Sequence, residues 1–548
     1  MDVFICSKIN IFSQRFQTNH ISRIKDSSGE WVEDVDGIRR HIISYFHDVF
    51  ASSRPQEIDI AIGTGHLRQV VDASMAEDLL QPFTAIEVQS ALFSMAPLKS
   101  LGPDAIANRL KVLLDRIISP FQSTFVPGRL ITDNVLLAFE LNHFLNTKTK
   151  GGQGYMALKL DVSKAYDKVE WAFLKQVMLK LGFPSRFVRL IMFCVSSVSY
   201  SFMLGGCQFG SLIPERGLRQ GDPLSPYLFL LCTESFCSLI QRAESAARIQ
   251  GISICRGAPC ISHLLFADDT LIFSKASLSS VRAIKDLLEI YRRASGQEIN
   301  FHKSSVAFSR NTPEALSIGL ASVLNIRKEN KMELYLGLPS RVVRSKRELF
   351  SMIRDRIWKR ITGWNDKFLS QAGKEVLIKS VVQAIPSYAM SCFKLPVTLM
   401  TEIQGMISNF WWHNRGQRKI HWLSWQHLCD SKLQGGLGFR RLHLFNLAML
   451  AKNLWRIFTS PERPLCRVLR ARYFPHGNIF AATVGHRPSY TWRSIMAAHR
   501  LFCAGCRWRV SSGEKIKVWT DPWLPRPVSF RPPSPPRMNA LSFCEFQI

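Results

Sequence analysis

The segment Ile261-Ser-His-Leu-Leu-Phe-Ala-Asp-Asp-Thr-Leu-Ile-Phe273 sets two adjacent carboxylates, Asp268 and Asp269, between two apolar runs. This pattern predicts a strand, a tight turn and a second strand, with both acids at the tip of the hairpin. Adjacent carboxylates repel each other, and a bound divalent cation relieves that repulsion. An Asp-Asp pair is also common in solvated turns, so these residues alone leave a metal site and a plain turn both open.

A third carboxylate, Asp161, belongs to a segment in which apolar residues alternate with other types from Met156 to Val162. The alternation predicts a strand with one buried face. Beyond Ser163 the apolar residues recur at helical spacing, which predicts a helix that contains Tyr166. Asp161 would then lie where a strand gives way to a helix, free to face the hairpin tip. A capping or turn aspartate is the alternative interpretation.

A polar turn, Arg219-Gln-Gly-Asp-Pro223, lies between these two segments in the sequence. Gly221 lets the backbone approach a ligand closely, with Gln220 beside it. Two prolines then open an apolar stretch, which predicts a helix over residues 227–240. Such a turn is also an ordinary helix entry, so the specific signal is the order of the three segments.

In this order the segments resemble the palm of a reverse transcriptase, and the surrounding residues narrow the resemblance to the plant LINE-type (non-LTR) retrotransposon enzymes. The resemblance extends over roughly residues 20 to 525. It is carried by Gln122-Ser-Thr-Phe-Val-Pro-Gly-Arg-Leu-Ile-Thr-Asp-Asn134, Leu158-Lys-Leu-Asp-Val-Ser-Lys-Ala-Tyr-Asp167, Arg219-Gln-Gly-Asp-Pro-Leu-Ser-Pro226, Phe266-Ala-Asp-Asp269, Gly296-Gln-Glu-Ile-Asn-Phe-His-Lys-Ser304 and Tyr335-Leu-Gly-Leu-Pro339. It implies an α+β chain with the right-hand polymerase fold: partial fingers, a palm with an antiparallel sheet, and a helical thumb.

The resemblance also implies a catalytic site. Asp161, Asp268 and Asp269 would be catalytic and would hold two Mg²⁺ ions. Magnesium suits such a site because it takes few protein carboxylates and keeps positions for substrate phosphates. A pair of ions serves both the attacking and the leaving oxygen of an in-line displacement.

Four further residues receive roles from the resemblance. Tyr166 would sit beneath the incoming sugar and exclude a 2′-hydroxyl, while Gln220 and Gly221 would contact the template and the nucleotide. Lys303 would stand near the leaving phosphate and donate a proton to it. From the residues alone, Tyr166 is equally an ordinary core residue and Lys303 an ordinary surface lysine.

Composition agrees with a polyanionic partner. The formal net charge is +29 and the pI is near 9.9, and an excess of cations gives sequence-independent affinity for nucleic acid through counterion release. Together with the resemblance, this predicts an RNA template, a DNA primer and dNTPs as partners. No segment is long and apolar enough for a membrane span, and the N-terminus lacks the apolar core of a signal peptide.

The chain has 13 scattered cysteines, which predicts a reduced, intracellular location, nuclear or cytoplasmic, rather than secretion. Cys503 and Cys506 have metal-like spacing but no second Cys/His pair, so zinc binding there stays open. The predicted organisation is a helical N-terminal region (1–95), fingers and palm (97–340), a helical thumb or connection (341–470), a small C-terminal region (471–523) with a hairpin over Trp508–Trp519, and a disordered tail (524–548).

The sequence departs from the family pattern after Pro97-Leu-Lys-Ser-Leu-Gly-Pro-Asp104, which resembles the start of the fingers. Only Ala105 and Ile106 separate it from a segment that lies several dozen residues further on in relatives. The missing part normally includes basic residues that hold the triphosphate, so we expect an internal fingers deletion that weakens nucleotide binding. No segment resembles an endonuclease, a Cys/His zinc module or a ribonuclease H domain, so we also expect a truncated relic.

Three functions follow as hypotheses. The first is an RNA-directed DNA polymerase of a non-LTR retrotransposon, with activity impaired by the missing segment. The second is a catalytically inactive nucleic-acid-binding relic, which the deletion favours and the intact carboxylates disfavour. The third is a metal-dependent nuclease; it is disfavoured because Tyr166, Gln220 and Lys303 belong to nucleotide addition.

Overall fold

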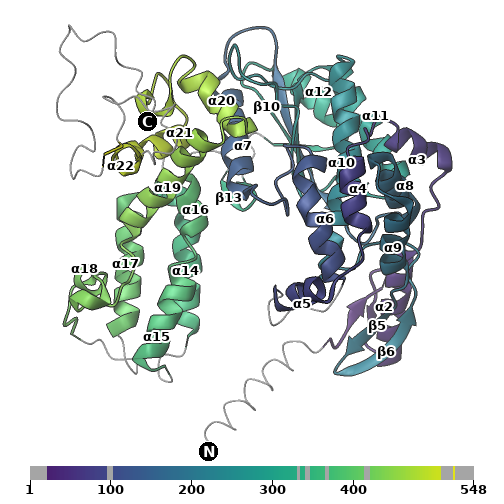
Figure 1. Cartoon of the computed structure of the whole chain (residues 1–548), viewed down its shortest axis with the longest axis horizontal. Helices are drawn as coiled ribbons and strands as arrows, with labels where there is room; N and C mark the ends of the chain where they lie inside the picture. The colour runs from purple at the N-terminus through teal and green to yellow at the C-terminus, as the bar shows by residue number, and fades with distance from the viewer. Residues whose placement is uncertain are drawn as a thin grey trace, which may run out of the picture. The chain divides into compact units, whose positions relative to one another are not determined.

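The computed structural model describes residues 21–26, 28–94, 103–329, 334–339, 346–364, 369–412, 420–507 and 523–524. The chain divides into two compact units. Unit 1 comprises Met1–Asn134, Leu141–Ile254 and Pro259–Leu336, and unit 2 comprises Val135–Glu140, Cys255–Ala258 and Gly337–Ile548. Figure 1 labels the helices and strands of both units.

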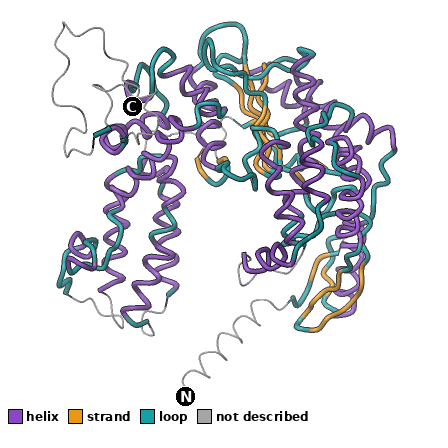
Figure 2. Tube along the Cα trace, viewed as in Figure 1, coloured by secondary structure: helices purple, strands orange, loops and turns teal. Residues whose placement is uncertain are grey.

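A five-stranded sheet in the order β11-β10-β3-β8-β7 forms the framework of unit 1, where its strands gather in Figure 2. Its strands are β3 (Tyr155–Leu160), β7 (His263–Phe266), β8 (Asp269–Lys275), β10 (Ser305–Phe308) and β11 (Arg327–Lys328). β3 pairs antiparallel with both β8 and β10, whereas β10 and β11 are parallel. The predicted hairpin is confirmed, because β7 and β8 pair antiparallel across a short turn.

The strand predicted over residues 156–162 is confirmed as β3, but it is buried on both faces rather than one. Ala157 and Leu158 point to opposite faces of the sheet, and each is 0% exposed. A central strand of a sheet that is covered on both sides has this pattern. After β3 the chain continues into β4 (Val162–Ser163), which pairs with β9 (Glu298–Ile299) in a separate two-stranded ribbon.

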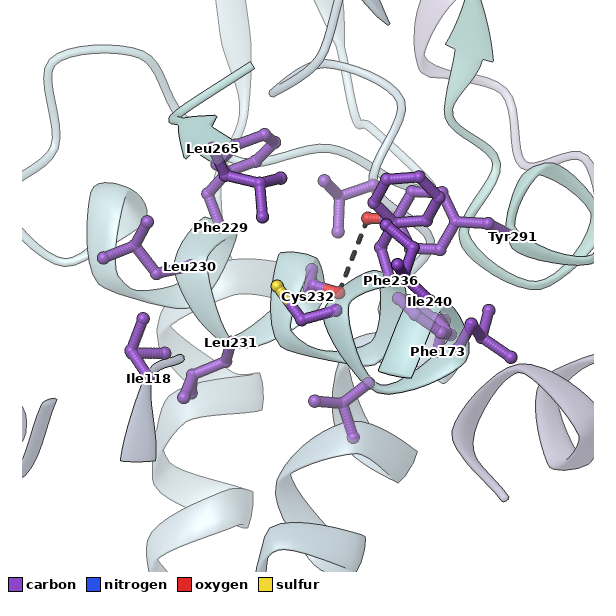
Figure 3. Close-up of a cluster of buried hydrophobic side chains, with 14 of the residues drawn as sticks. Ile118, Phe173, Phe229, Leu230, Leu231, Cys232, Phe236, Ile240, Leu265 and Tyr291 are labelled. Atoms are coloured by element: carbon purple, nitrogen blue, oxygen red, sulfur yellow. Dashed lines mark hydrogen bonds between the residues drawn. The ribbon is translucent and has the colours of Figure 1, made fainter. Parts of the chain in front are cut away.

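The long helix α10 (Ser225–Ser245) passes through the core of unit 1 and confirms the helix predicted over residues 227–240. Its central residues Leu230 and Leu231 are 0% exposed. It contacts α3 (Glu57–Thr64), α6 (Asp104–Ile117), α8 (Trp171–Leu181) and α11 (Leu278–Ser295). Figure 3 shows this apolar cluster, in which the Tyr291 hydroxyl donates a hydrogen bond to the Cys232 carbonyl at 3.4 Å.

The helix predicted to begin just beyond Ser163 is wrong, because residues 164–168 form turns and α8 begins only at Trp171. The carbonyls of Tyr166 and Val169 accept hydrogen bonds from the N–H groups of Leu218 and Gly217, each at 2.8 Å. These carbonyls therefore bond to another segment instead of along a helix, and tertiary contacts override the local apolar spacing.

The described part of the N-terminal region is mostly helical and contains one short hairpin, in which β1 pairs antiparallel with β2. The other elements of unit 1 are β1 (Ile24–Lys25), β2 (Trp31–Val32), α2 (Val35–Phe50), α4 (Ala73–Leu80), α5 (Ala85–Ser94), α9 (Ser185–Ser196), β5 (Tyr200–Leu204), β6 (Cys207–Leu212), α12 (Glu314–Leu324) and β12 (Leu334–Tyr335). α7 (Ile131–Thr147) contributes residues to both units.

Over its described residues, unit 2 consists mainly of helices. Its elements are β13 (Leu338–Pro339), α13 (Lys346–Leu349), α14 (Ser351–Gly363), α15 (Gln371–Leu377) with a π-turn at Ile378–Val382, α16 (Ser387–Cys392), α17 (Val397–Trp412), α18 (Trp425–Leu428), α19 (Leu442–Thr459), α20 (Pro464–Tyr473), α21 (Tyr490–Met496) and α22 (His499–Gly505), with 3₁₀ turns at Lys432–Gln434 and Ile479–Ala481. The predicted hairpin over Trp508–Trp519 and the tail beyond Leu524 lie outside the described residues. Throughout the described part of the chain, every helix is too short or too polar to cross a bilayer.

Gly217 makes the turn that docks on the Tyr166 segment, and its replacement should destabilise unit 1. Its φ is +97°, and an added Cβ would lie 2.6 Å from the Asp167 carbonyl oxygen. We expect Gly217→Ala to lower the free energy of unfolding by about 3 kcal/mol, from backbone strain plus the clash. Gly205→Ala is the matched control, because Gly205 has φ +59° but open space around it, and should cost about 1 kcal/mol. Equal losses in thermal unfolding of the two variants would contradict this account.

Glu234 on α10 should make stability depend on pH. Burial raises the pKa of Glu234 from its ordinary 4.5 to about 7, although its carboxylate accepts the Ser119 N–H at 2.8 Å. Because the folded-state pKa is above the unfolded one, the ionised carboxylate costs stability at pH 8, and the cost vanishes below about pH 4.5. We expect Glu234→Gln to raise the free energy of unfolding at pH 8, on the order of 2 kcal/mol, and to change little at pH 4.5.

The control for this pH dependence is Glu289→Gln, which should have the opposite sign. Hydrogen bonds from Arg292 and Arg293 lower the pKa of Glu289 to about 2, so its ionised form contributes stability above pH 4.5 that is lost as the pH falls towards 2. Melting curves at pH 8 would show a gain for Glu234→Gln and a loss for Glu289→Gln, and at pH 4.5 the gain for Glu234→Gln would disappear. A Glu234→Gln variant that is no more stable than the wild type at pH 8 would refute the assignment.

Candidate active site

The three predicted carboxylates come together at one end of the central sheet. The last pair in the β3–β8 register is Leu160 with Thr270, so Asp161 and Asp269 are the next residues facing each other. Asp268 stands beside them in the turn of the β7–β8 hairpin. Directly opposite residues of an antiparallel pair project to the same face, which places the carboxylates of Asp161 and Asp269 on one side.

The pKa of Asp269 responds to the charges of both other acids. Burial raises the pKa of the Asp269 carboxyl, Lys159 lowers it, and the negative charges of Asp268 and Asp161 raise it further. Like charges at close range disfavour ionisation, so this end of the sheet carries more negative charge than Lys159 offsets. A cation bound at this position would reduce the repulsion between the carboxylates.

A loop contributed by residues 300–304 is fastened to the backbone of Asp161. The Asp161 N–H donates to Ser304 Oγ at 3.2 Å, and its carbonyl accepts the Asn300 N–H at 2.8 Å. The Lys303 N–H donates to Asn300 Oδ1 at 3.2 Å. The backbone of Lys303 is therefore fixed to the same loop that bonds to Asp161. The Lys303 side chain itself is exposed. Sequence reasoning missed Ser304 and Asn300 as positioning residues, although both lie within the matched segment.

Two buried side-chain amides form hydrogen bonds to the backbone of the hairpin tip. Gln122 Oε1 accepts the Ala267 N–H at 3.3 Å, and Asn134 Nδ2 donates to the Leu265 carbonyl at 2.6 Å. Ala267 has a left-handed φ of +53°, which a bond to its N–H helps to hold. Gln122 and Asn134 open and close one matched segment of the sequence, and this bracing role was not predicted.

Tyr166 is both packed and close to the carboxylates. Its ring stacks on Phe229 with centroids 4.7 Å apart and planes 10° apart. Burial and the charge of Asp268 raise the pKa of Tyr166 to about 12, so the hydroxyl stays protonated at neutral pH. One face of the ring therefore belongs to the core, and the residue borders the acidic site; its role beneath the sugar stays a prediction.

The turn that contains Gln220 and Gly221 is tied to the same region. Gln220 Nε2 donates to Asp167 Oδ1 at 3.0 Å, and the Leu218 N–H donates to the Tyr166 carbonyl. Burial raises the pKa of Asp167, and the bond from Gln220 opposes that rise. Gly221 is exposed and has φ +90°, a conformation that favours glycine.

The donor set suits Mg²⁺, since hard carboxylate oxygens on a turn are its usual protein ligands. In the part of the chain that is described, however, no three His, Cys, Asp or Glu side chains are already arranged to hold a metal ion. The acids are near one another but do not form a complete set of metal ligands. This fits an ion that takes part of its coordination shell from substrate phosphates. At the Cys503/Cys506 pair, whose metal binding the sequence left open, Cys503 Sγ lies 3.6 Å from His499 Nε2.

Comparison with known proteins identifies the family. The family model described as reverse transcriptase (RNA-dependent DNA polymerase) matches residues 103–339, which contain all of the predicted site residues. An uncharacterized mitochondrial protein of Arabidopsis thaliana is 46% identical over 143 residues, which cover 26% of this chain and 93% of that protein.

Two transposon proteins match longer stretches at lower identity. The Transposon TX1 uncharacterized 149 kDa protein of Xenopus laevis is 27% identical over 67% of this chain and 27% of its own length. A Pol polyprotein from the type-1 retrotransposable element R2 of Popillia japonica is 29% identical over 37% of this chain and 29% of its own length. The chain thus spans under a third of each of these relatives. With its carboxylates at the end of an antiparallel palm sheet, the chain belongs to the reverse transcriptases of non-LTR retrotransposons and has their right-hand polymerase fold.

Proposed function

We propose that this chain is an RNA-directed DNA polymerase that transfers a nucleotide from a dNTP to the 3′-hydroxyl of a DNA primer on an RNA template. The observation that carries the proposal is the convergence of Asp161, Asp268 and Asp269 beside Tyr166. A nuclease would need the carboxylates but has no use for an aromatic ring that borders them.

The carboxylates would hold two Mg²⁺ ions, which when bound lower the pKa of the primer hydroxyl and neutralise charge on the leaving group. The primer oxygen would bond to the α-phosphorus as the bond to pyrophosphate breaks. Lys303 would return a proton to the pyrophosphate from its exposed position in the 300–304 loop. Tyr166 would support the sugar, since its ring is fixed against Phe229 and its hydroxyl stays protonated.

The net charge of +29 supports nucleic acid as the partner, because phosphate contacts release counterions and give affinity for any sequence. An intracellular site of action, nuclear or cytoplasmic, is supported by the cysteines, since the 11 within the described residues form no disulfide.

We also propose that activity is impaired by a missing fingers segment. Helix α6 (Asp104–Ile117) runs without a break through the point where relatives carry several dozen more residues. The neighbouring helix α5 leaves Ile86 79% and Phe93 82% exposed, and Val112 of α6 is 78% exposed. Apolar side chains gathered on two packed helices indicate a surface that lost its cover. This observation favours the second candidate, a nucleic-acid-binding relic that no longer clamps the triphosphate.

Primer extension on an RNA template tests the function. We expect magnesium-dependent extension by the wild type and none by Asp161→Asn or Asp268→Asn, while both variants keep their affinity for primer–template within about twofold. Asp286→Asn is the matched control, since Asp286 is an exposed acid on α11 that bonds to Arg248 at 2.8 Å, and it should extend like the wild type.

Three results would redirect the proposal. Extension that persists in Asp161→Asn or Asp268→Asn would refute the catalytic assignment. A folded wild type that binds primer–template but extends nothing, at any dNTP concentration, would select the relic. Magnesium-dependent cutting of the strand that Asp268→Asn abolishes would select the nuclease.

Tyr166→Ala should admit ribonucleotides, because it removes the ring that would meet a 2′-hydroxyl. We expect the ratio of kcat/KM for dNTP over rNTP to fall at least about tenfold, whereas Tyr166→Phe keeps the ring and should keep the ratio. Thermal unfolding of both variants separates this effect from loss of the stacking on Phe229. An unchanged ratio in a folded Tyr166→Ala variant would remove the gate role.

A further inference from the structure

A concave surface lies close to the proposed catalytic site, because its lining includes Ser163, two residues beyond Asp161. It is an open groove of about 650 Å³. One wall comes from Ser163 and residues 299–302, and the other from the end of α12 and the start of β11, residues 321–327. The volume is within the range of about 300–1,000 Å³ that small-ligand sites occupy.

Two residues of the first wall are connected to the backbone of Asp161. Ser163 is two residues beyond Asp161 and pairs with Glu298 in the ribbon. Asn300, another lining residue, donates its N–H to the Asp161 carbonyl at 2.8 Å. A ligand in the groove would therefore rest on the same loop that holds Asp161 in place.

The lining of the groove has the chemistry of a nucleotide site. Phe301 is 45% exposed, an apolar ring that faces water, and bases stack on such rings whatever their identity. Arg327 and His302 are exposed, and among the described residues no carboxylate pairs with Arg327 or lines the groove. The neighbouring Lys328, by contrast, is paired with Glu314. Asn300 and Asn325 add amides that can bond to base edges.

A solvated surface is the simpler interpretation of any one of these residues. A single exposed phenylalanine needs no explanation, and an exposed arginine is common. Their position on opposite walls of one groove, with amides beside them and no lining acid, is not accounted for in that way. An acid-free lining matters because the groove lies near three clustered carboxylates, where a phosphate needs local cations to approach.

We propose that this groove binds one nucleotide unit, with its base on Phe301 and its phosphate at Arg327. The unit belongs either to a single strand passing the catalytic site or to a free nucleotide. This deepens the proposed function and rests on it only for the nature of the ligand, because binding in the groove does not require synthesis.

The test uses the full chain and a labelled single-stranded oligonucleotide. We expect Phe301→Leu to weaken binding about tenfold, because leucine keeps the apolar volume but loses the stacking face. Arg327→Gln should reduce the slope of log affinity against log salt by about 0.7, the value for one phosphate contact on a single strand. Matched controls are Phe193→Leu and Arg186→Gln, which change an exposed ring and an exposed arginine on α9, away from the groove, and should change neither quantity.

Photo-crosslinking locates the site without any substitution. An oligonucleotide with a photoreactive base should crosslink to the tryptic peptide 294–303, which contains Phe301. Competition by a free dNTP would assign the groove to free nucleotides, and crosslinking that survives the competitor would assign it to a strand.

The proposal is overturned if the groove variants match the α9 controls in affinity and salt slope, and the crosslink falls on other peptides. This outcome is distinct from failure of the proposed function. A wild type that makes no DNA but shows the expected crosslink keeps the groove and loses the polymerase. A wild type that extends primers, with groove variants that bind normally, keeps the polymerase and loses the groove.

Discussion

The antiparallel pairing of β3 with β8 is the constraint on which the rest of unit 1 depends. Its register brings Asp161 opposite Asp269 one step past the last pair, and the hairpin turn adds Asp268. A slip by one residue would send Asp161 to the other face of the sheet and disperse the carboxylates. Burial holds the register, since Ala157 and Leu158 are fully covered on opposite faces of the sheet. A shifted register would put a polar neighbour into one of these buried positions.

Lys159 offsets part of the charge repulsion at the end of this sheet, and hydrogen bonds to the backbone fix the positions of the acids. Ser304 and Asn300 hold Asp161, and Gln122 holds the turn before Asp268. Neutral donors and acceptors fix the positions of the acids without neutralising them, which leaves their charge available for a metal ion and substrate. A site stabilised by salt bridges would be easier to fold but would offer its ligands less charge.

The sequence predicted the parts of the site whose signals are local. The β7–β8 hairpin follows from two apolar runs around Asp268 and Asp269, and α10 follows from its prolines and apolar length. The helix expected after Ser163 failed because the carbonyls of Tyr166 and Val169 bond to a distant segment, which no local pattern encodes. Gln122 was missed for the same reason: its partner, Ala267, is far away in the chain.

The core of unit 1 also explains how the carboxylates keep their arrangement. α10 and α11 pack with α8 and α3 into an apolar cluster that includes β3 and β8 residues. The exposed side chains of Ile86 and Phe93 on α5 lie outside this cluster. The proposed loss of a fingers segment beside α5 and α6 would therefore leave the hydrogen bonds around Asp161 in place. The geometry of the catalytic end depends on the core, whereas binding of a triphosphate would depend on the fingers.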